Sequence, residues 1–271
     1  MQNTQLTTSH PSKPKRFVIV SLAATAMVLG SQLPASARNP LQSSTSISGL
    51  IAYYKMNEGS GNVARNKVAN DKHLQIVGAD WSRGKFGKGL QFSGTDGLPP
   101  GASDYARADG PFDFGSNEAT IATWFRYNEM DGHWHPVISA PECCSYRVLV
   151  YPDGHLYIDA GQHYDWYVQE IVLQPAKWYH IALTMRGGEA ARLYVNGSLI
   201  ATNSQAVPFQ LPNPSAFVLG TGEWDSGFYY GLNGKLDETR IYNKVLNQNE
   251  VRAAMRPGVR GETDGSDDRE D

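Results

Sequence analysis

The stretch RLYVNGSLIA at residues 192–201 carries the strongest local signal for the fold of this chain. Strand-forming residues flank Asn196-Gly197 on both sides, and these two residues tolerate the positive φ angles of a type I′ turn. Such a turn matches the twist of the two strands that it joins. The stretch therefore predicts a β-hairpin.

The alternation of apolar and polar residues continues beyond this hairpin. Residues 177–185 alternate with period two, so their odd-numbered apolar side chains share one face of a strand. A second hairpin is predicted for residues 146–151 and 155–160, joined by Pro152-Asp153-Gly154. Further strands are expected at residues 50–54, 89–93, 120–126 and 234–243. Short strands at this spacing predict an all-β fold, a two-sheet antiparallel jelly-roll sandwich.

One short helix is expected at the C-terminal end of this domain. Asn247 is a good N-cap, and Glu250 stands where it can return the capping hydrogen bond. Leu246 can pack onto Val251 across that cap. Because a proline follows at position 257, we expect the helix to end near Met255.

Residues 1–37 have the order of a secretory signal peptide. Three basic residues at positions 13–16 precede an apolar run at 17–30, and Ala35-Ser36-Ala37 offers a small-residue cleavage site. The apolar run is shorter than the ~20 residues that a membrane-spanning helix needs. We therefore expect a secreted, periplasmic or cell-surface protein with no membrane insertion after cleavage. An uncleaved signal anchor is the alternative.

A polar linker at residues 38–46, one domain at 47–256 and a disordered acidic tail at 257–271 are expected to follow. Removing the signal segment would shift the formal net charge from −3 to −6, and the tail carries six acidic residues against two arginines. An acidic tail without aromatic residues stays solvated. This balance leaves no basic surface for nucleic acid.

The chain has two cysteines, Cys143 and Cys144, which are neighbours in sequence. Ordinary disulfides join Cα atoms about 4.4–6.8 Å apart, whereas neighbours across a trans peptide bond are ~3.8 Å apart. A conventional disulfide framework is therefore excluded. A strained vicinal ring or two buried thiols are favoured over a metal site, and a link to another chain is a further interpretation.

Five segments, in this order, resemble laminin G-like domains of the concanavalin A-like lectin/glucanase superfamily. They are LIAYY with NEG at residues 50–59, GKGLQFSG at 87–94, TIATWF at 120–125, WYHIALT with LYVNG at 178–197, and GKLDETRIYN with LNQNE at 234–250. The resemblance covers roughly residues 48–256. It implies two stacked antiparallel sheets, one convex and one concave. It implies no single function, because this fold hosts lectins, adhesion modules and glycoside hydrolases.

The acid pattern of hydrolases with this fold is incomplete here, and we expect no catalytic residue. Retaining members place acids on one strand face as Glu-x-Asp-x-x-Glu, which brings two carboxyls about 5 Å apart. The segment 129–134 begins such a pattern but lacks the final acid. Asp237 and Glu238 are adjacent, so a regular strand would point them to opposite faces. His133 and His135 lack a third ligand at metal-site spacing, which favours a polar loop.

Aromatic residues gather in the predicted loops beside polar side chains. Sugars offer apolar C–H faces and hydroxyl rims, which suit aromatic platforms paired with planar polar groups, and such rings also anchor protein interfaces. The alternative for any one ring is that it caps the sandwich core. The expected ligand-binding residues are Trp134, Tyr164, Trp166, Trp224, Asp225 and Tyr229.

The resemblance also implies a structural calcium ion, held on the convex side by an acid of the closing strand and by loop carbonyls. Asp237 matches that acid, with Asn57 and Gly94 as neighbouring main-chain ligands. Ca²⁺ takes about six to eight oxygen ligands, so one carboxylate with carbonyls and water would make a modest site. The other interpretation is that Asp237 accepts backbone hydrogen bonds at a strand edge.

Three functional hypotheses follow from these observations. The first is a secreted non-catalytic module that binds a polysaccharide or a glycan of cell-surface glycoproteins. The second is an adhesion or scaffold module that binds an extracellular protein. The third, a glycoside hydrolase with an atypical acid pair, ranks last.

Overall fold

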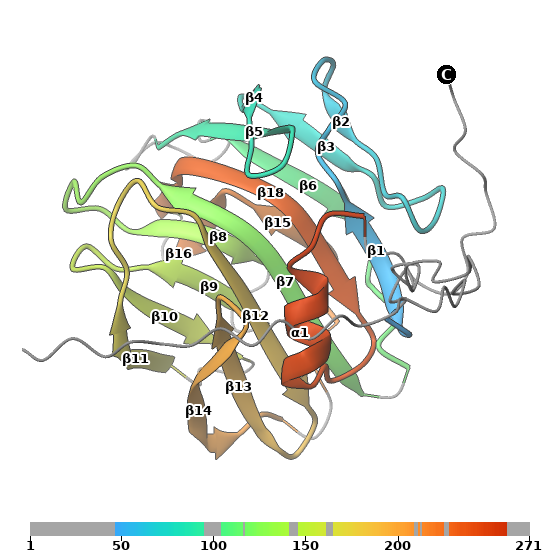
Figure 1. Cartoon of the computed structure of the whole chain (residues 1–271), viewed down its shortest axis with the longest axis vertical. Coiled ribbons are helices and arrows are strands. Elements are labelled where there is room, and N and C mark those ends of the chain that lie inside the picture. Colours follow the sequence, from blue (N-terminus) through green and yellow to red (C-terminus); the bar gives the residue numbers. More distant parts are fainter. Residues whose placement is uncertain are drawn as a thin grey trace, which may run out of the picture. The chain divides into compact units, whose positions relative to one another are not determined.

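The computed structural model describes residues 47–94, 104–115, 117–140, 146–160, 165–208, 211, 213–224 and 228–258. These residues form two large antiparallel sheets, one small hairpin and one helix (Figure 1). The predicted all-β sandwich with one short C-terminal helix is confirmed. The signal segment, the linker and both cysteines lie outside the described residues. Among the described residues, no helix is long and apolar enough to cross a membrane.

The first sheet, called here the helix-side sheet, has α1 (Gln248–Ala254) on its outer face. The pairing of β12 with β7 is continuous over eight residue pairs and sets Leu183 opposite Ile121. The order of the strands is β14 (Ser198–Ala206), β13 (Ala190–Val195), β12 (Tyr179–Arg186), β7 (Glu118–Tyr127), β18 (Asn233–Tyr242), β5 (Lys88–Ser93) and β4 (Asp80–Arg83), with β1 (Leu50–Tyr54) also paired to β18.

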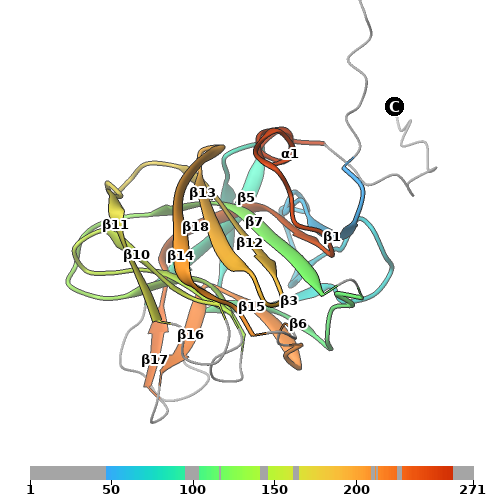
Figure 2. The same cartoon turned by 90° about the horizontal axis from the view of Figure 1, so that it is seen from below.

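The second sheet, called here the hairpin-side sheet, carries the small hairpin of β16 (Thr221–Trp224) and β17 (Phe228–Gly231). The order of its strands is β11 (Asp165–Val172), β10 (His155–Asp159), β9 (Arg147–Val150), β8 (His135–Ser139), β15 (Ala216–Leu219), β6 (Tyr105–Asp109), β3 (Leu74–Val77) and β2 (Val63–Ala64). Figure 2 shows this small hairpin and α1 on opposite sides of the sandwich.

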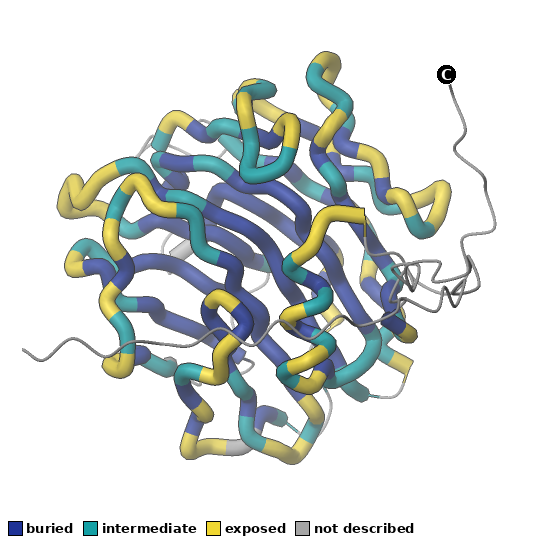
Figure 3. Tube along the Cα trace, viewed as in Figure 1, coloured by how far each residue is buried: buried dark blue, intermediate teal, exposed yellow. Residues whose placement is uncertain are grey.

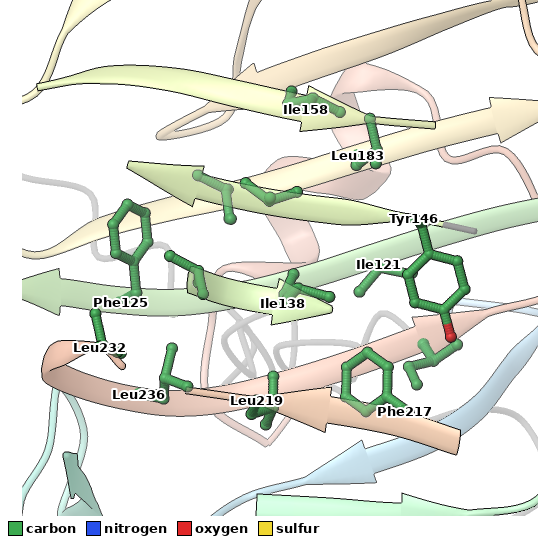
Figure 4. Close-up of a cluster of buried hydrophobic side chains, with 14 of the residues drawn as sticks. Ile121, Phe125, Ile138, Tyr146, Ile158, Leu183, Phe217, Leu219, Leu232 and Leu236 are labelled. Atoms are coloured by element: carbon green, nitrogen blue, oxygen red, sulfur yellow. The ribbon is translucent and has the colours of Figure 1, made fainter. Parts of the chain in front are cut away.

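The main core lies between the two sheets, and the strands that line it are buried along most of their length (Figure 3). Phe125 and Leu236 of the helix-side sheet face Ile138 and Leu219 of the hairpin-side sheet (Figure 4). Period-two alternation directs these residues inward, and their polar neighbours in sequence point outward. The interleaved side chains are what hold the two sheets together.

Local sequence signals correctly located the turn and the helix cap. Asn196 and Gly197 both have positive φ, at 50° and 76°, as the type I′ turn requires. Asn247 caps α1, and the side chain of Glu250 accepts a hydrogen bond from the Asn247 backbone N–H at 2.8 Å. Leu246 and Val251 belong to a second apolar cluster that seats α1 on the helix-side sheet.

Candidate functional site

The outer face of the hairpin-side sheet carries the ring-rich surface of the described structure. In β10, Leu156 and Ile158 enter the core, so the alternate residues His155, Tyr157 and Asp159 point to the opposite face. Residues paired with β10 in the two neighbouring strands continue this face on both sides. Tyr157 pairs with Leu149 of β9 and with Tyr167 of β11.

Five rings meet on this face, and we call them the aromatic cluster. The centroid of Trp134 lies 4.3 Å from that of Tyr151, 6.2 Å from that of Tyr157 and 5.6 Å from that of Tyr230. Trp134 and Tyr230 are nearly parallel, with 18° between their planes. Tyr167 completes the cluster edge-on to Tyr151, at 5.2 Å.

The exposure of these rings makes the cluster a surface rather than part of the core. Tyr157 is buried, at 5% exposure, whereas Trp134, Tyr151, Tyr167 and Tyr230 are each partly exposed. Partly exposed rings in offset or edge contact hold one another in place while leaving apolar surface accessible. This surface therefore offers accessible apolar ring area to a ligand.

A fixed polar group borders the cluster at the turn between β9 and β10. The hydroxyl of Tyr167 donates to Asp153 Oδ2 at 2.5 Å, and the backbone N–H of His155 donates to Asp153 Oδ1 at 3.0 Å. The Tyr167 ring also lies 4.9 Å from the His155 imidazole. The bond to Asp153 raises the pKa of Tyr167 to about 12, so its hydroxyl keeps its proton at neutral pH.

The pKa of Asp153 moves in the opposite direction. Its slight burial would raise the value, but the hydrogen bonds from Tyr167 and from His155 outweigh that effect and lower the pKa. Asp153 is therefore a carboxylate at neutral pH, held in one orientation by its donors. Its side chain is 53% exposed, so it can also accept a hydrogen bond from a ligand.

The structure places the predicted binding residues unevenly. Trp134 is central to the aromatic cluster, whereas Trp166 is partly exposed and packs against the core, and its binding role stays a prediction. Trp166 pairs with the core residue Ile158, so its neighbour Tyr167 occupies the outer face instead. Tyr164 and Asp225 lie outside the described residues, as do the side chains of Trp224 and Tyr229.

The list of expected binding residues includes one of the five rings, Trp134, and leaves out Tyr151, Tyr157, Tyr167 and Tyr230. A signal for Tyr157 was present, because it alternates with Leu156 and Ile158 in a predicted strand. The same reasoning would have assigned Tyr151 to the outer face. Their approach to Trp134 depends on strand order, which alternation does not encode.

A second polar group lies buried on the outer face of the helix-side sheet, around the bulge in β18. The register with β7 shifts between Asp237 and Arg240, and Glu238 has a positive φ of 57°. Asp237 pairs with Trp124, and Glu238 Oε2 accepts a hydrogen bond from Arg240 Nη2 at 2.6 Å. The expectation that Asp237 and Glu238 point to opposite faces is therefore wrong, because the extra bulge residue interrupts alternation.

The segment 255–258, which we call the C-terminal strap, closes over this buried group. The indole N–H of Trp124 donates to the Met255 carbonyl, and Arg240 Nη2 donates to the Arg256 carbonyl, both at 3.0 Å. The backbone N–H of Gly258 donates to the hydroxyl of Tyr53 at 3.4 Å. These bonds indicate a structural anchor for the C-terminal end of the domain.

Two of the three expected calcium ligands, Asn57 and Asp237, contact the same turn at residues 84–88, and the third, Gly94, lies apart from them. Asn57 Oδ1 accepts the backbone N–H of Lys88 at 2.7 Å, at the start of β5, whereas Gly94 follows the other end of that strand. Asp237 Oδ2 accepts the backbone N–H of Phe86 at 2.8 Å. Among the described side chains, no three His, Cys, Asp or Glu residues are grouped to hold a metal ion. Asp237 Oδ2 thus acts as a backbone acceptor, whereas Asp237 Oδ1 is buried without a hydrogen-bond partner among the described residues, and calcium stays a prediction.

The family of the chain follows from comparison with known proteins. A laminin G model, described as the concanavalin A-like lectin/glucanases superfamily, matches residues 100–252, which is more than half of this chain. The chain belongs to the concanavalin A-like lectin/glucanase superfamily. Superfamily members include both binding modules and glycosidases. No curated protein sequence matches the chain.

Solved structures share the fold of this concanavalin A-like domain at low sequence identity. Domain 4 of AbnA, a GH43 extracellular arabinanase from Geobacillus stearothermophilus in complex with arabinotriose, aligns with a TM-score of 0.55 and 18% identity over 77% of this chain and 99% of that chain. A Trypanosoma rangeli sialidase in complex with a difluoro-KDN inhibitor aligns with a TM-score of 0.58 and 18% identity over 76% of this chain. The chain spans only 32% of that sialidase.

A protein-bound domain with the same fold was also found. The binding domain of botulinum neurotoxin DC, in complex with rat synaptotagmin II, aligns with a TM-score of 0.54 and 11% identity over 75% of this chain and 50% of that chain. At these sequence identities the similarity shows a shared fold alone. A proposed function therefore has to rest on the aromatic cluster.

Asp237 gives this concanavalin A-like domain a predicted pH dependence. Burial raises its pKa to about 8 from the ordinary value of 3.8, and the Glu238 carboxylate adds to the rise while the Phe86 N–H opposes it. Between these values the folded state keeps a proton that the unfolded chain releases, so stability falls as the pH rises. In Asp237→Asn, which cannot titrate, we expect the decrease between pH 5 and pH 8 to be smaller by up to about 4 kcal/mol.

The measurement is denaturant unfolding of the native chain and Asp237→Asn across that pH range. The comparison uses the change of stability with pH, so a constant difference between the two proteins does not affect it. Parallel curves for the two proteins would show that Asp237 is not the titrating group.

Proposed function

We propose that this chain is an exported, non-catalytic module that binds a carbohydrate through the aromatic cluster. The observation that carries the proposal is the convergence of Trp134, Tyr151, Tyr157, Tyr167 and Tyr230 on one outer face. The apolar C–H face of a sugar ring would pack on the exposed ring surface. The fixed Asp153 carboxylate would accept hydrogen bonds from its hydroxyls.

The comparison with the arabinanase domain supports the same proposal. That domain is matched over nearly its whole length and was solved with an oligosaccharide, so a domain of this size and fold can bind a sugar. Export is part of the proposal, through cleavage after Ala37 of the signal segment. N-terminal sequencing of protein recovered outside the cytoplasm would test that step.

Protein binding is the second candidate function. Tyr and Trp are the residues most enriched at the centres of protein interfaces, so the aromatic cluster would also suit a protein partner. The neurotoxin domain solved with synaptotagmin II gives this candidate a precedent in the fold. The two candidates differ in ligand class while sharing one surface.

One observation favours the catalytic alternative, so the experiment below also tests for turnover. The register of β10 and β11 places Asp159 opposite Asp165, and paired acids are what a glycoside hydrolase requires. Asp159 is 3% exposed and lies 3.7 Å from the Arg147 guanidinium, an arrangement typical of a structural ion pair. We therefore favour binding without turnover.

The test is a glycan array probed with the full domain, once with calcium and once with chelator, followed by product analysis on every glycan that binds. The proposal expects binding to at least one glycan, with no product formed. Array silence together with capture of a purified extracellular protein would replace it with the second candidate. Release of reducing ends, lost in Asp159→Asn, would replace it with hydrolysis.

A further inference from the structure

The segments that build the aromatic surface have an unusual charge composition. Their described parts are residues 128–135, 146–160, 165–172, 221–224 and 228–231. Together they contain one arginine, Arg147, and no lysine. The acidic residues among them whose side chains the structure describes are Glu129, Asp131, Asp153, Asp159 and Glu170. Whatever approaches this surface therefore meets a negative potential.

The single arginine already has an acidic partner. Arg147 and Asp159 are cross-strand partners in β9 and β10, and Arg147 Nη2 lies 3.7 Å from Asp159 Oδ2. Both side chains are largely buried, at 13% and 4% exposure. A ligand carboxylate that recruited Arg147 would leave the Asp159 carboxylate buried without its counter-charge, which is strongly unfavourable. Arg147 is thus not available as an anion receptor.

The exposed Asp153 carboxylate at the border of the cluster would repel an anionic ligand group, but it can accept a hydrogen bond from a ligand hydroxyl. Asp153 is bonded to Tyr167, which in turn contacts Tyr151, so the carboxylate lies directly beside the rings. A carboxylate offers about four acceptor positions. The Tyr167 hydroxyl and the His155 backbone N–H occupy two of them, and the His155 imidazole, whose Nδ1 lies 3.1 Å from Asp153 Oδ1, occupies a third. The remaining position can accept a hydroxyl proton, whereas an anionic ligand group would be repelled.

From these three observations we infer that the ligand is a neutral glycan, and that carboxylated or sulfated glycans are excluded by charge. The inference rests on the proposed function, because it presumes that the aromatic cluster binds sugars. It adds the class of ligand and the physical basis of its selection. Stacking on the rings contributes affinity for every pyranose or furanose, and the acidic residues around the cluster repel the anionic sugars.

The experiment uses an array that carries each neutral oligosaccharide beside its acidic counterpart, such as lactose beside 3′-sialyllactose and oligogalactose beside oligogalacturonate. Among pairs that bind, we expect the acidic member to be at least ~10-fold weaker at about 50 mM salt. Because the repulsion is electrostatic, the difference should shrink at about 0.5 M salt. Acidic members that bind as tightly as their neutral counterparts overturn the inference and leave the proposed function standing. Silence over the whole array overturns both.

A charge variant identifies the group responsible. Asp153→Asn keeps an acceptor oxygen and removes the charge, so we expect it to narrow the neutral-to-acidic preference by about 3-fold. Asp80→Asn is the matched control, because it makes the same charge change on an exposed residue of β4 in the other sheet. An equal change of preference in both variants would assign the selection to net charge alone and overturn the role of Asp153.

Discussion

Replacing Trp134 with alanine is expected to weaken glycan binding at least roughly 30-fold, which corresponds to about 2 kcal/mol. Trp134 contacts three of the other four rings of the aromatic cluster, so its removal deletes the largest apolar platform and loosens its neighbours. The ring is only partly buried and lies in the loop before β8, so the fold should survive. Isothermal titration with the best glycan from the array measures the loss.

Trp166→Ala, in the edge strand β11 of the same sheet, provides the contrasting variant. Because Trp166 packs against the core from β11, we expect a lower melting temperature with affinity within about 3-fold of the native value. The far-ultraviolet circular dichroism of both variants should match that of the native chain. If Trp134→Ala binds normally while Trp166→Ala does not, the ligand surface has been assigned to the wrong face of the sheet.

Replacing Arg240 with methionine is expected to destabilise the domain by about 3–5 kcal/mol, because the substitution leaves the Glu238 carboxylate buried without a counter-charge, with the Tyr53 hydroxyl as its remaining donor. Both side chains are fully buried, and Arg240 Nη2 joins Glu238 to the carbonyl of Arg256 in the C-terminal strap. For a domain of this size, each kcal/mol lowers the melting temperature by roughly 2–4 °C. Thermal unfolding followed by circular dichroism should thus show a decrease of at least about 6 °C.

The double variant Glu238→Leu with Arg240→Met separates charge from packing. If the buried charge causes the loss, removing both partners should restore much of the stability that the single variant lost. A double variant less stable than the single one would show instead that the hydrogen bonds to the strap dominate. Glycan binding should be unaffected in both, because the bulge lies on the other sheet from the aromatic cluster.

The hairpin turn and the helix show which features of the fold the local sequence predicts correctly. The turn at Asn196-Gly197, the cap at Asn247 and the end of α1 near Met255 were predicted and are present. Each depends on residues at most a few positions apart, whose backbone angles and hydrogen bonds are set by their own chemistry. Motif order also led to the correct superfamily, because the segments lie in the strands of one sandwich.

Prediction of the site was weaker for two different reasons. Trp166 was chosen because its segment is rich in aromatic and polar residues. Neighbouring residues of a strand point to opposite faces, however, and Trp166 is on the face that packs against the core. Asp237 and Glu238 were assigned by regular alternation, which a bulge with Glu238 at positive φ overrides. Neither the register of β11 nor the bulge in β18 is signalled by the neighbouring residues.

The amino-acid sequence alone determined that the chain alternates with period two, turns at defined positions and belongs to a sandwich superfamily. Only the tertiary structure decided that Trp134, Tyr151, Tyr157, Tyr167 and Tyr230 meet, and that Arg147 is held by Asp159. The physical reason is that period two states which residues share a face of their own strand. Which strands become neighbours depends on long-range pairing, and a binding surface assembled across several strands depends on that pairing too.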